Sequence, residues 1–306
     1  MIAVWMILAL VLLVILTAYV CFCITFYVRR KPLTDEFQIP PGKEYLPFKE
    51  QMISWMKETR QLPFKEVSIT SYDGLKLYGK YYEYEKDAPV EILFPGYRGL
   101  AERDLCGAVQ RCFILKRNAL VVDQRTCGKS EGRVITFGIR EHKDCIDWVN
   151  FAVKTFGEHT RIIITGISMG AATVTMAAAK TLPKNVIGVL ADCGYSSAKD
   201  IIKCEIKKRH LSPTVFYPFV KFGARLFGGF DIEEYSPFDA VQNCKLPIIF
   251  VHGEADDFVP CEMSVRLYNA CVSKKTLFTV PGAAHGLSYI IDPEGYFKTL
   301  NDFKYE

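Results

Sequence analysis

The amino-acid sequence predicts a single α/β domain with a mostly parallel central sheet, flanking helices and a transmembrane helix at its N-terminus. Two observations support this prediction. Short runs of Val, Ile and Leu alternate with helical patterns from residue 90 onward, and residues 1–28 contain no charged side chain. Because 50% of the 306 residues are hydrophobic, the chain has enough apolar side chains for a sizeable core.

Residues 1–28 are predicted to form a transmembrane anchor. The segment is longer than the roughly 20 apolar residues that cross a bilayer as a helix. A cleaved signal peptide is the alternative, but it requires a basic start, an apolar stretch of about 7–15 residues and small residues at its cleavage site. Tyr19, Phe22 and Phe26 are bulky at the end where a peptidase needs small side chains. We therefore expect a retained, single-pass anchor in the cell membrane.

The basic residues Arg29, Arg30 and Lys31 follow this segment directly. Basic residues close to a span stay on the cytoplasmic side, so the globular part is predicted to face the cytoplasm. The eleven cysteines agree with a reducing compartment, because they are scattered and form no C-x-x-C pair. Residues 29–64 are interpreted as this basic cluster and a proline-bearing tether, which leads into an amphipathic stretch near residues 51–60.

The charge of the chain argues against binding to nucleic acid. The formal net charge is +4 at pH 7, and the three residues after the apolar segment supply most of it. The rest of the chain is close to neutral and lacks the basic face of a nucleic-acid-binding protein.

Residues 65–306 are predicted to form the globular domain. A hairpin comes first, because residues 67–84 alternate in polarity around Asp73-Gly74, two turn residues that tolerate positive φ. The later apolar runs are continuous, as in strands buried on both faces, and helical connections make such strands parallel. The predicted strands are 90–96, 118–124, 161–168, 186–194, 246–253 and 276–282, and the predicted helices are 101–116, 139–156, 169–182, 262–272 and 293–303. A basic and aromatic stretch at about residues 198–235 interrupts this order and is predicted to be a small helical cap inserted over one edge of the sheet.

Ser168 is the candidate nucleophile. It lies in a G-x-S-x-G motif, Gly166 to Gly170, which closes the most hydrophobic predicted strand and opens an alanine-rich helix. A serine at a sharp strand-to-helix turn needs glycines on both sides, because a Cβ at either would collide with neighbouring backbone. The start of the helix also presents free N–H groups to an anion. The alternative is that Ser168 only caps the helix.

The residues expected to activate this serine come later in the chain. This architecture places the acid after a late strand and the histidine after the last strand. Asp256 and Asp257 follow the run that ends at residues 252–253, and His285 lies in a glycine-rich loop after the last run. The other four histidines lie in or after a polar helix, in the basic insertion or at a strand end. His285 is therefore the candidate base, and Asp256 or Asp257 the candidate acid.

Three motifs in this order make the chain resemble the α/β-hydrolase superfamily. They are G-x-S-x-G, H-G-x-x-D-x-x-V-P at residues 252–260 and G-x-x-H-G at residues 282–286. The chain is most similar to membrane-tethered bacterial serine hydrolases of the group that includes monoacylglycerol-lipase-like, acyl-protein-thioesterase-like and serine aminopeptidase enzymes. The resemblance covers about residues 65–305 and implies an α/β-hydrolase fold. It also implies Asp256 as the acid, with Asp257 second.

The resemblance further implies an oxyanion hole formed by the backbone N–H groups of Tyr97 and Met169. The chain departs from the superfamily here, because Phe94-Pro95-Gly96 stands where His-Gly is usual, and Cys127 stands where histidine is common in a later loop. A proline removes only its own N–H, so both donors remain.

The activity implied by the resemblance is hydrolysis of acyl esters, including lipid-like ones, through a Ser-His-Asp triad and an acyl-enzyme. A serine aminopeptidase or amidase, an acyltransferase on the same fold and a non-catalytic membrane scaffold are the alternatives. No cluster of His, Cys, Asp and Glu has the spacing of metal ligands, so we expect neither a metal nor an organic cofactor.

The cap is expected to set substrate preference. Phe216 and Phe219 are the candidate substrate-binding residues, because a pocket under an aromatic cap would accept an apolar acyl chain. The alternative is that they are ordinary helix core. The nearby basic residues are expected to contact anionic lipid head groups if the cap faces the membrane; these are Lys203, Lys207, Lys208 and Arg209.

Overall fold

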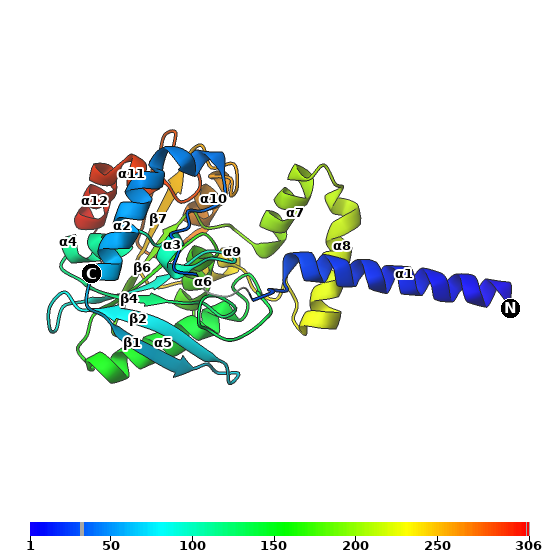
Figure 1. Cartoon of the computed structure of the whole chain (residues 1–306), viewed down its shortest axis with the longest axis horizontal. Coiled ribbons are helices and arrows are strands. Elements are labelled where there is room, and N and C mark those ends of the chain that lie inside the picture. The colour runs from blue at the N-terminus through cyan, green and yellow to red at the C-terminus, as the bar shows by residue number, and fades with distance from the viewer. Residues whose placement is uncertain (31–33, 304, 306) are drawn as a thin grey trace.

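The computed structural model describes residues 1–30, 34–303 and 305 (Figure 1). Lys31, the third member of the basic cluster, lies outside the described residues. An eight-stranded sheet forms the centre, with the strand order β1-β2-β4-β3-β5-β6-β7-β8. β2 is antiparallel to both of its neighbours and every other pairing is parallel, which confirms the mostly parallel sheet. The strands are β1 (Lys65–Thr70), β2 (Lys76–Tyr82), β3 (Val90–Phe94), β4 (Asn118–Val122), β5 (Ile162–Ile167), β6 (Val186–Asp192), β7 (Ile248–Gly253) and β8 (Lys275–Val280).

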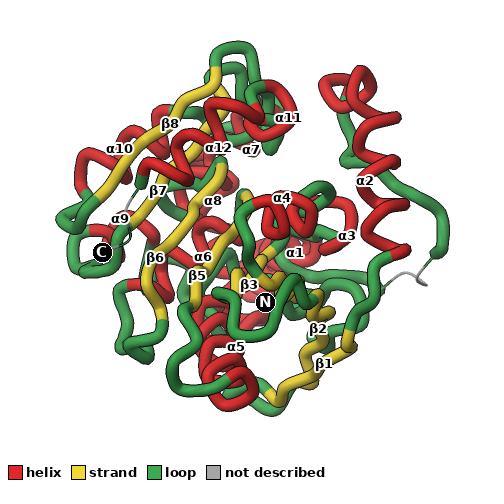
Figure 2. Tube along the Cα trace, turned by 90° about the vertical axis from the view of Figure 1, so that its left-hand side faces the viewer, coloured by secondary structure: helices red, strands yellow, loops and turns green. Residues whose placement is uncertain are grey.

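Helices cover both faces of this sheet, whose strands form a twisted row from β8 to β1 (Figure 2). One face carries α5 (Glu141–Phe156), α6 (Met169–Ala178) and α10 (Glu262–Ala270), and the other carries α4 (Ala108–Ile114) and α12 (Pro293–Asp302). Shorter helices connect these elements: α3 (Ala101–Asp104), α9 (Pro237–Val241) and α11 (Ser288–Ile291). The single helix expected over residues 101–116 is thus divided into α3 and α4.

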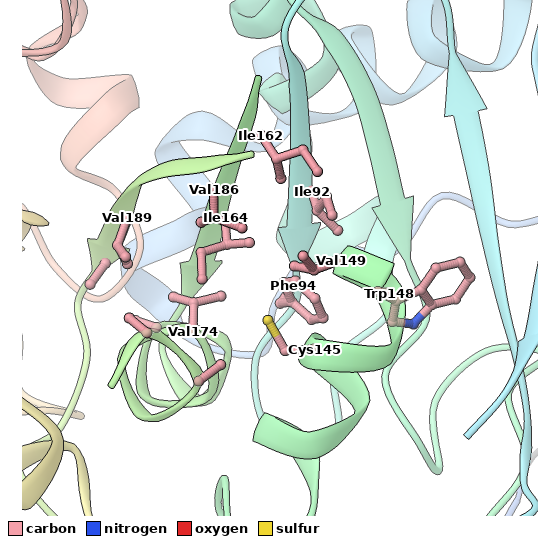
Figure 3. Packing of buried hydrophobic residues seen from close by; sticks show 14 of the residues in the cluster. Ile92, Phe94, Cys145, Trp148, Val149, Ile162, Ile164, Val174, Val186 and Val189 are labelled. Carbon is pink, nitrogen blue, oxygen red and sulfur yellow. The ribbon is translucent and has the colours of Figure 1, made fainter. Parts of the chain in front are cut away.

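The core follows from the continuous apolar runs of the strands. Successive side chains of a strand point to opposite faces, so every second residue of β3 joins the same helix layer. Ile92 and Phe94 pack against Trp148 and Val149 of α5 (Figure 3), whereas Leu93 packs on the α4 side. A strand buried on both faces carries apolar residues at most positions, which is why these runs do not alternate. Glu91 of β3 is a buried exception, and it forms ion pairs with Arg111 and Arg117.

The N-terminal apolar segment forms one long helix, α1 (Ile2–Thr25), with a mean hydropathy of 3.0 over its most apolar window. Figure 1 shows α1 extending away from the sheet. Its last turns contact the inserted cap, which consists of α7 (Ala198–Lys208), α8 (Pro213–Gly223) and a π-helical turn, η2 (Ala224–Gly228). α1 and the cap therefore form one helical unit on one side of the sheet.

The expected tether contains two ordered elements that pack on the globular domain. A 3₁₀ helix, η1 (Lys43–Phe48), leads into α2 (Lys49–Gln61). Tyr45, Met52 and Met56 are buried with Leu287, which follows the last strand. Arg60 of α2 also forms an ion pair with Glu102 of α3 at 2.6 Å. This segment is part of the folded domain, since its amphipathic face meets the edge of the sheet where the parallel strands end.

Candidate active site

Ser168 lies at the turn between β5 and α6. Its backbone has φ 58° and ψ −118°, a conformation that non-glycine residues rarely adopt. The Ser168 N–H donates to the carbonyl of Asp192 at the end of β6, at 2.8 Å. This strained turn places the serine at the carboxyl edge of the parallel strands, where α/β folds usually bind ligands.

The two glycines of the motif allow this turn to form. A Cβ on Gly166 would lie 2.1 Å from the backbone of Gly170, and a Cβ on Gly170 would lie 2.1 Å from the carbonyl oxygen of Phe94. Real Cβ atoms do not approach backbone so closely, so neither position tolerates a side chain unless the strand and helix move apart. Close packing of β3, β5 and α6 therefore requires glycine at both positions.

His285 and Asp256 form a short hydrogen bond beside this turn. The Nδ1 atom of His285 lies 2.6 Å from Asp256 Oδ2. The backbone N–H groups of Phe258 and Val259 donate to Asp256 Oδ1 at 2.8 and 2.7 Å, so both carboxylate oxygens have partners. Asp257 is exposed. Of the two candidate acids, the structure places Asp256 against His285.

A second histidine supports the carboxylate of Asp256. His252 Nε2 lies 2.8 Å from the Val259 carbonyl and 3.2 Å from Asp256 Oδ2. A carbonyl only accepts, so Nε2 carries the proton. Burial alone raises the pKa of Asp256, but hydrogen bonds from His252 and His285 outweigh it and lower the pKa to about 2. The sequence analysis set His252 aside as a strand-end residue; only its packing reveals this contact.

The second ring nitrogen of His285 faces Cys193. Its Nε2 lies 3.9 Å from Cys193 Sγ, and among the residues that the structure describes no hydrogen bond joins it to Ser168 Oγ. Burial raises the pKa of the Cys193 thiol well above its ordinary value, so the thiol stays protonated and is a poor nucleophile. Hydrogen bonds between base and nucleophile are often long without substrate, so this geometry suits a base that engages Ser168 when substrate binds.

Cys193, Asp256 and His285 also place three potential metal ligands within 4.8 Å of one another. Two observations argue against metal binding at this group. Asp256 Oδ2 is already hydrogen-bonded to His285, and a metal requires the thiolate form of cysteine, which burial of Cys193 opposes.

The candidate oxyanion donors lie on two segments that flank Ser168. Met169 is the first residue of α6, so its N–H has no acceptor within the helix. Tyr97 follows the loop after β3, where Gln124 Nε2 donates to the Pro95 carbonyl at 2.5 Å and the Gly96 N–H donates to Asp104 at 3.1 Å. These contacts fix the loop that lacks the usual histidine.

A cavity of about 400 Å³ opens beside Ser168 and His285. That volume lies within the usual range of small-molecule sites. Its walls are largely apolar and come from α2, α4, β3 and the segments after β5 and β8; they include Met52, Trp55, Leu93, Leu105, Ile167, Leu287 and Ile290. Ser168 and His285 thus lie beside a hydrophobic cavity that is large enough for a small molecule.

The cap does not line this cavity, in contrast to the expectation for Phe216 and Phe219. Within the described chain, no residue of 198–235 belongs to the cavity wall. Phe216 packs instead against the cluster that contains Phe22 and Phe26. The assignment of these two phenylalanines as substrate-binding residues is therefore corrected. The cap packs against the end of α1, whereas α2 supplies part of the cavity wall.

The segment from Pro40 to Trp55 supplies the missing wall. Tyr45 lines the cavity, and its hydroxyl donates to the backbone carbonyl of His285 at 2.9 Å. Sequence reasoning missed this residue, although the amphipathic stretch near residues 51–60 indicated a helix with a buried face. Pattern alone did not show which surface that face covers.

Part of the cavity wall is a buried polar group. Tyr296 donates to Asp192 Oδ2 at 2.9 Å, and Arg111 Nη1 donates to the Tyr296 hydroxyl at 3.2 Å. Asp192 Oδ1 and Arg111 Nε are buried without a hydrogen-bond partner among the described residues. Burial raises the pKa of Asp192 to about 6. The cavity thus combines largely apolar walls with a buried polar group.

The eight-stranded sheet, the strained serine turn and the histidine after the last strand define an α/β hydrolase of the serine-hydrolase type. The model of the prolyl oligopeptidase family matches residues 136–292, a range that includes Ser168, Asp256 and His285. The chain belongs to this family.

Two curated relatives share moderate sequence similarity with the chain. YqkD of Bacillus subtilis is 28% identical over 61% of this chain and 61% of its own length. Protein bem46 of Schizosaccharomyces pombe is 28% identical over 62% of this chain and 58% of its own length. The chain thus matches about three-fifths of the length of these relatives.

Solved structures show the same fold. An esterase of Pyrococcus furiosus superposes with a TM-score of 0.67 at 22% identity, over 90% of this chain and 96% of the esterase. The acylaminoacyl peptidase of Pyrococcus horikoshii superposes with a TM-score of 0.58 at 17% identity, over 79% of this chain and 41% of the peptidase. At these identities the likeness establishes the fold alone.

The two neighbouring aspartates provide a test of the geometry. Asp256→Asn should lower kcat by about 10⁴, because an amide N–H facing His285 Nδ1 selects the wrong tautomer of the ring. Asp257→Asn should leave kcat nearly unchanged, because that side chain is exposed. Initial rates with a p-nitrophenyl ester measure both variants. A larger loss for Asp257→Asn would transfer the role of the acid to that residue.

Proposed function

We propose that the protein is a membrane-anchored serine hydrolase that cleaves acyl esters through Ser168, His285 and Asp256. One observation carries this proposal. His285, which bonds Asp256 at 2.6 Å, and Ser168, at its strained turn, line the same apolar cavity. Nucleophile, base and acid thus come from three loops at one edge of the sheet.

In the proposed mechanism His285 Nε2 removes the proton of Ser168 Oγ as that oxygen attacks the acyl carbon. Asp256, which stays ionised at neutral pH, holds the proton on Nδ1 and stabilises the charged ring. His285 then gives its proton to the departing alcohol, which leaves an acyl-serine. Water attacks this ester after losing a proton to His285, and the acid product leaves as Ser168 regains its proton.

The negative charge on the carbonyl oxygen needs fixed donors during both steps. We assign this role to the backbone N–H groups of Tyr97 and Met169. Loss of one such donor typically lowers kcat by about 10²–10³. The bonds from Gln124 and Asp104 to the loop before Tyr97 support this assignment, since they hold the donor in place before substrate arrives.

The cavity supports an acyl ester of intermediate chain length as the substrate. Its apolar walls favour a hydrocarbon chain, and each buried methylene contributes about 0.8 kcal/mol, or about fourfold in affinity. The buried polar group of Arg111 and Asp192 is part of the same wall. A chain that reaches those residues buries them against hydrocarbon, which costs free energy.

Removal of the nucleophile tests the proposed function directly. Ser168→Ala should abolish ester hydrolysis and labelling by a fluorophosphonate without lowering the melting temperature, because one oxygen is lost at a turn that already holds a small side chain. Cys193→Ala is the matched control for the other candidate nucleophile beside His285, and it should retain labelling. Labelling that persists in Ser168→Ala would refute the assignment.

The cavity predicts how the rate depends on acyl chain length. With p-nitrophenyl esters of increasing length, kcat/KM should rise beyond acetate and fall once the chain reaches the buried polar group of Arg111 and Asp192. Met52→Ala should raise KM for the longer esters, whereas Ile53→Ala, a neighbour on α2 outside the cavity wall, should not. A steady fall from acetate upward would contradict an acyl pocket.

Amide hydrolysis is the second candidate, and the match to the prolyl oligopeptidase family favours it. The same acyl-enzyme forms from an amide, with an amine as the leaving group. Exclusive activity on peptides with free amino termini would replace the ester proposal by an aminopeptidase. An ester product formed with an added alcohol would instead identify an acyltransferase.

We further propose that α1 anchors the protein in the membrane with the catalytic domain in the cytoplasm. The apolar, largely exposed surface of α1 and the basic residues that follow it support this topology. Protease added to sealed right-side-out vesicles should therefore spare the domain, and the same protease should degrade it once detergent opens the vesicles. Degradation in sealed vesicles would reverse the orientation.

A further inference from the structure

The end of α1 is joined rigidly to the catalytic domain. Tyr97 Oη donates to the Thr25 carbonyl at 2.7 Å, and Arg98 donates to the carbonyls of Ile24 and Tyr27 at 2.9 Å. Tyr27 also forms a β-bridge with Val134. These contacts hold the end of α1 directly against the domain, so the axis of α1 determines how the domain sits on a membrane.

The free part of α1 is too short to cross a bilayer alone. Thr17 is partly buried and Ala18 is fully buried, so at most residues 2–17 are free of the domain. At about 1.5 Å per residue they extend about 24 Å, whereas a hydrocarbon core is about 30 Å thick. Any tilt shortens the span further. The remaining distance of about 6 Å must come from the part of α1 that contacts the cap.

That part of α1 is crossed by α8 at backbone contact. A Cβ on Gly223 would lie 2.5 Å from the Ala18 carbonyl oxygen, so glycine is required for this approach. The ring of Phe227 in η2 packs on Tyr19 and Phe22 of α1, with centroids 5.1 and 5.9 Å apart. Figure 1 shows α8 running across α1, which continues past it away from the sheet. A bilayer spanned by α1 thus reaches α8.

α8 and η2 carry a second apolar face that the protein does not cover. Tyr217, Val220, Gly223 and Ala224 form the buried face. A separate stripe recurs at spacings of four, three and four residues, which place it on one side of a helix. Its members are Val215, Phe219, Phe222 and Leu226, of which Val215, Phe222 and Leu226 are 54%, 42% and 50% exposed. A helix that only packs on its own domain needs one apolar face, so the stripe requires another apolar environment.

The charges near this stripe are compatible with a lipid surface. Lys221 forms an ion pair with Glu233 at 3.1 Å, and Arg225 pairs with Asp231, so both cations are neutralised within the protein. Lys207 and Arg209, at the turn that leads into α8, are exposed. Exposed basic residues next to an apolar stripe match a bilayer with anionic head groups.

We propose that the stripe of Val215, Phe219, Phe222 and Leu226 lies within the hydrocarbon of the bilayer leaflet nearest the domain. This proposal rests on the proposed membrane anchor and deepens it, since the cap becomes a second membrane contact. It also brings the cavity, which is lined by the same Arg98 that holds the end of α1, next to the lipid surface. Esters that reside in the leaflet are the substrate class that this position favours.

Quenching of tryptophan fluorescence by brominated lipid separates the anchor from the cap. The full chain has three tryptophans, of which Trp5 lies in α1 and Trp55 and Trp148 lie in the catalytic domain. The protein is reconstituted in vesicles of phosphatidylcholine, with or without anionic phosphatidylserine. The acyl chains of the lipid are either plain or brominated. Wild-type protein should lose the fluorescence of Trp5, whereas Trp5→Phe should lose little.

The cap is then tested in the Trp5→Phe background. Leu226→Trp adds a reporter at an exposed position, so it should not disturb folding, and bromine should remove most of the fluorescence that it adds. Val215→Trp, at the other end of the stripe, should give the same result. Ile114→Trp is the matched control, because Ile114 is 64% exposed on α4, on the opposite side of the domain from α8 (Figure 1), and bromine should leave it unquenched.

The outcomes distinguish the two proposals. Failure of bromine to quench Trp5 would overturn the membrane anchor. Quenching of Trp5 without quenching of Leu226→Trp and Val215→Trp would overturn the cap contact and leave the anchor intact. Protection of these two reporters from aqueous acrylamide without quenching by bromine would also overturn it, and would identify a second copy of the chain as the occupant.

Discussion

The structure depends on one tight backbone approach, between the start of α6 and the carbonyl of Phe94 in β3. Gly170 makes that approach possible, and Gly166 removes the clash on the other side of the turn. Ser168 between them is held at positive φ by the paired strands around it. Such strain costs about 1–3 kcal/mol and persists only where the surroundings determine it. The buried strands β3, β5 and β6 provide this rigidity, so the apolar core and the proposed chemistry share one cause.

The carboxylate of Asp256 shows the same relation between packing and electrostatics. Burial opposes its charge, and the hydrogen bonds from His252 and His285 keep it ionised, while two backbone N–H groups bond its other oxygen. His252 lies on β7 and His285 follows β8, so the pairing of these strands brings both rings to one carboxylate. An ionised acid at this position is what a general-base histidine requires.

The two N-terminal segments complete the site from opposite sides. Tyr45 of η1 contacts the backbone of His285, and the end of α1 is bonded to Tyr97, which carries a proposed oxyanion donor. The proposed membrane contact and the proposed chemistry are therefore mechanically connected. Movement of α1 relative to the domain would disturb the Tyr97 loop.

The sequence by itself determined the parts of the protein that local pattern encodes. Continuous apolar runs indicate buried strands, and the two glycines of G-x-S-x-G indicate the turn that carries Ser168. The sheet and the positions of Ser168 and His285 could therefore be predicted from the sequence. Resemblance was needed to favour Asp256 over Asp257. The tertiary structure alone decided that α2 rather than the cap lines the cavity, that His252 contacts Asp256 and that Arg111 meets Tyr296 in the cavity wall. The physical reason is that hydrophobic contact has no direction: an amphipathic helix shows that it has a buried face, but the partner of that face depends on how distant segments pack.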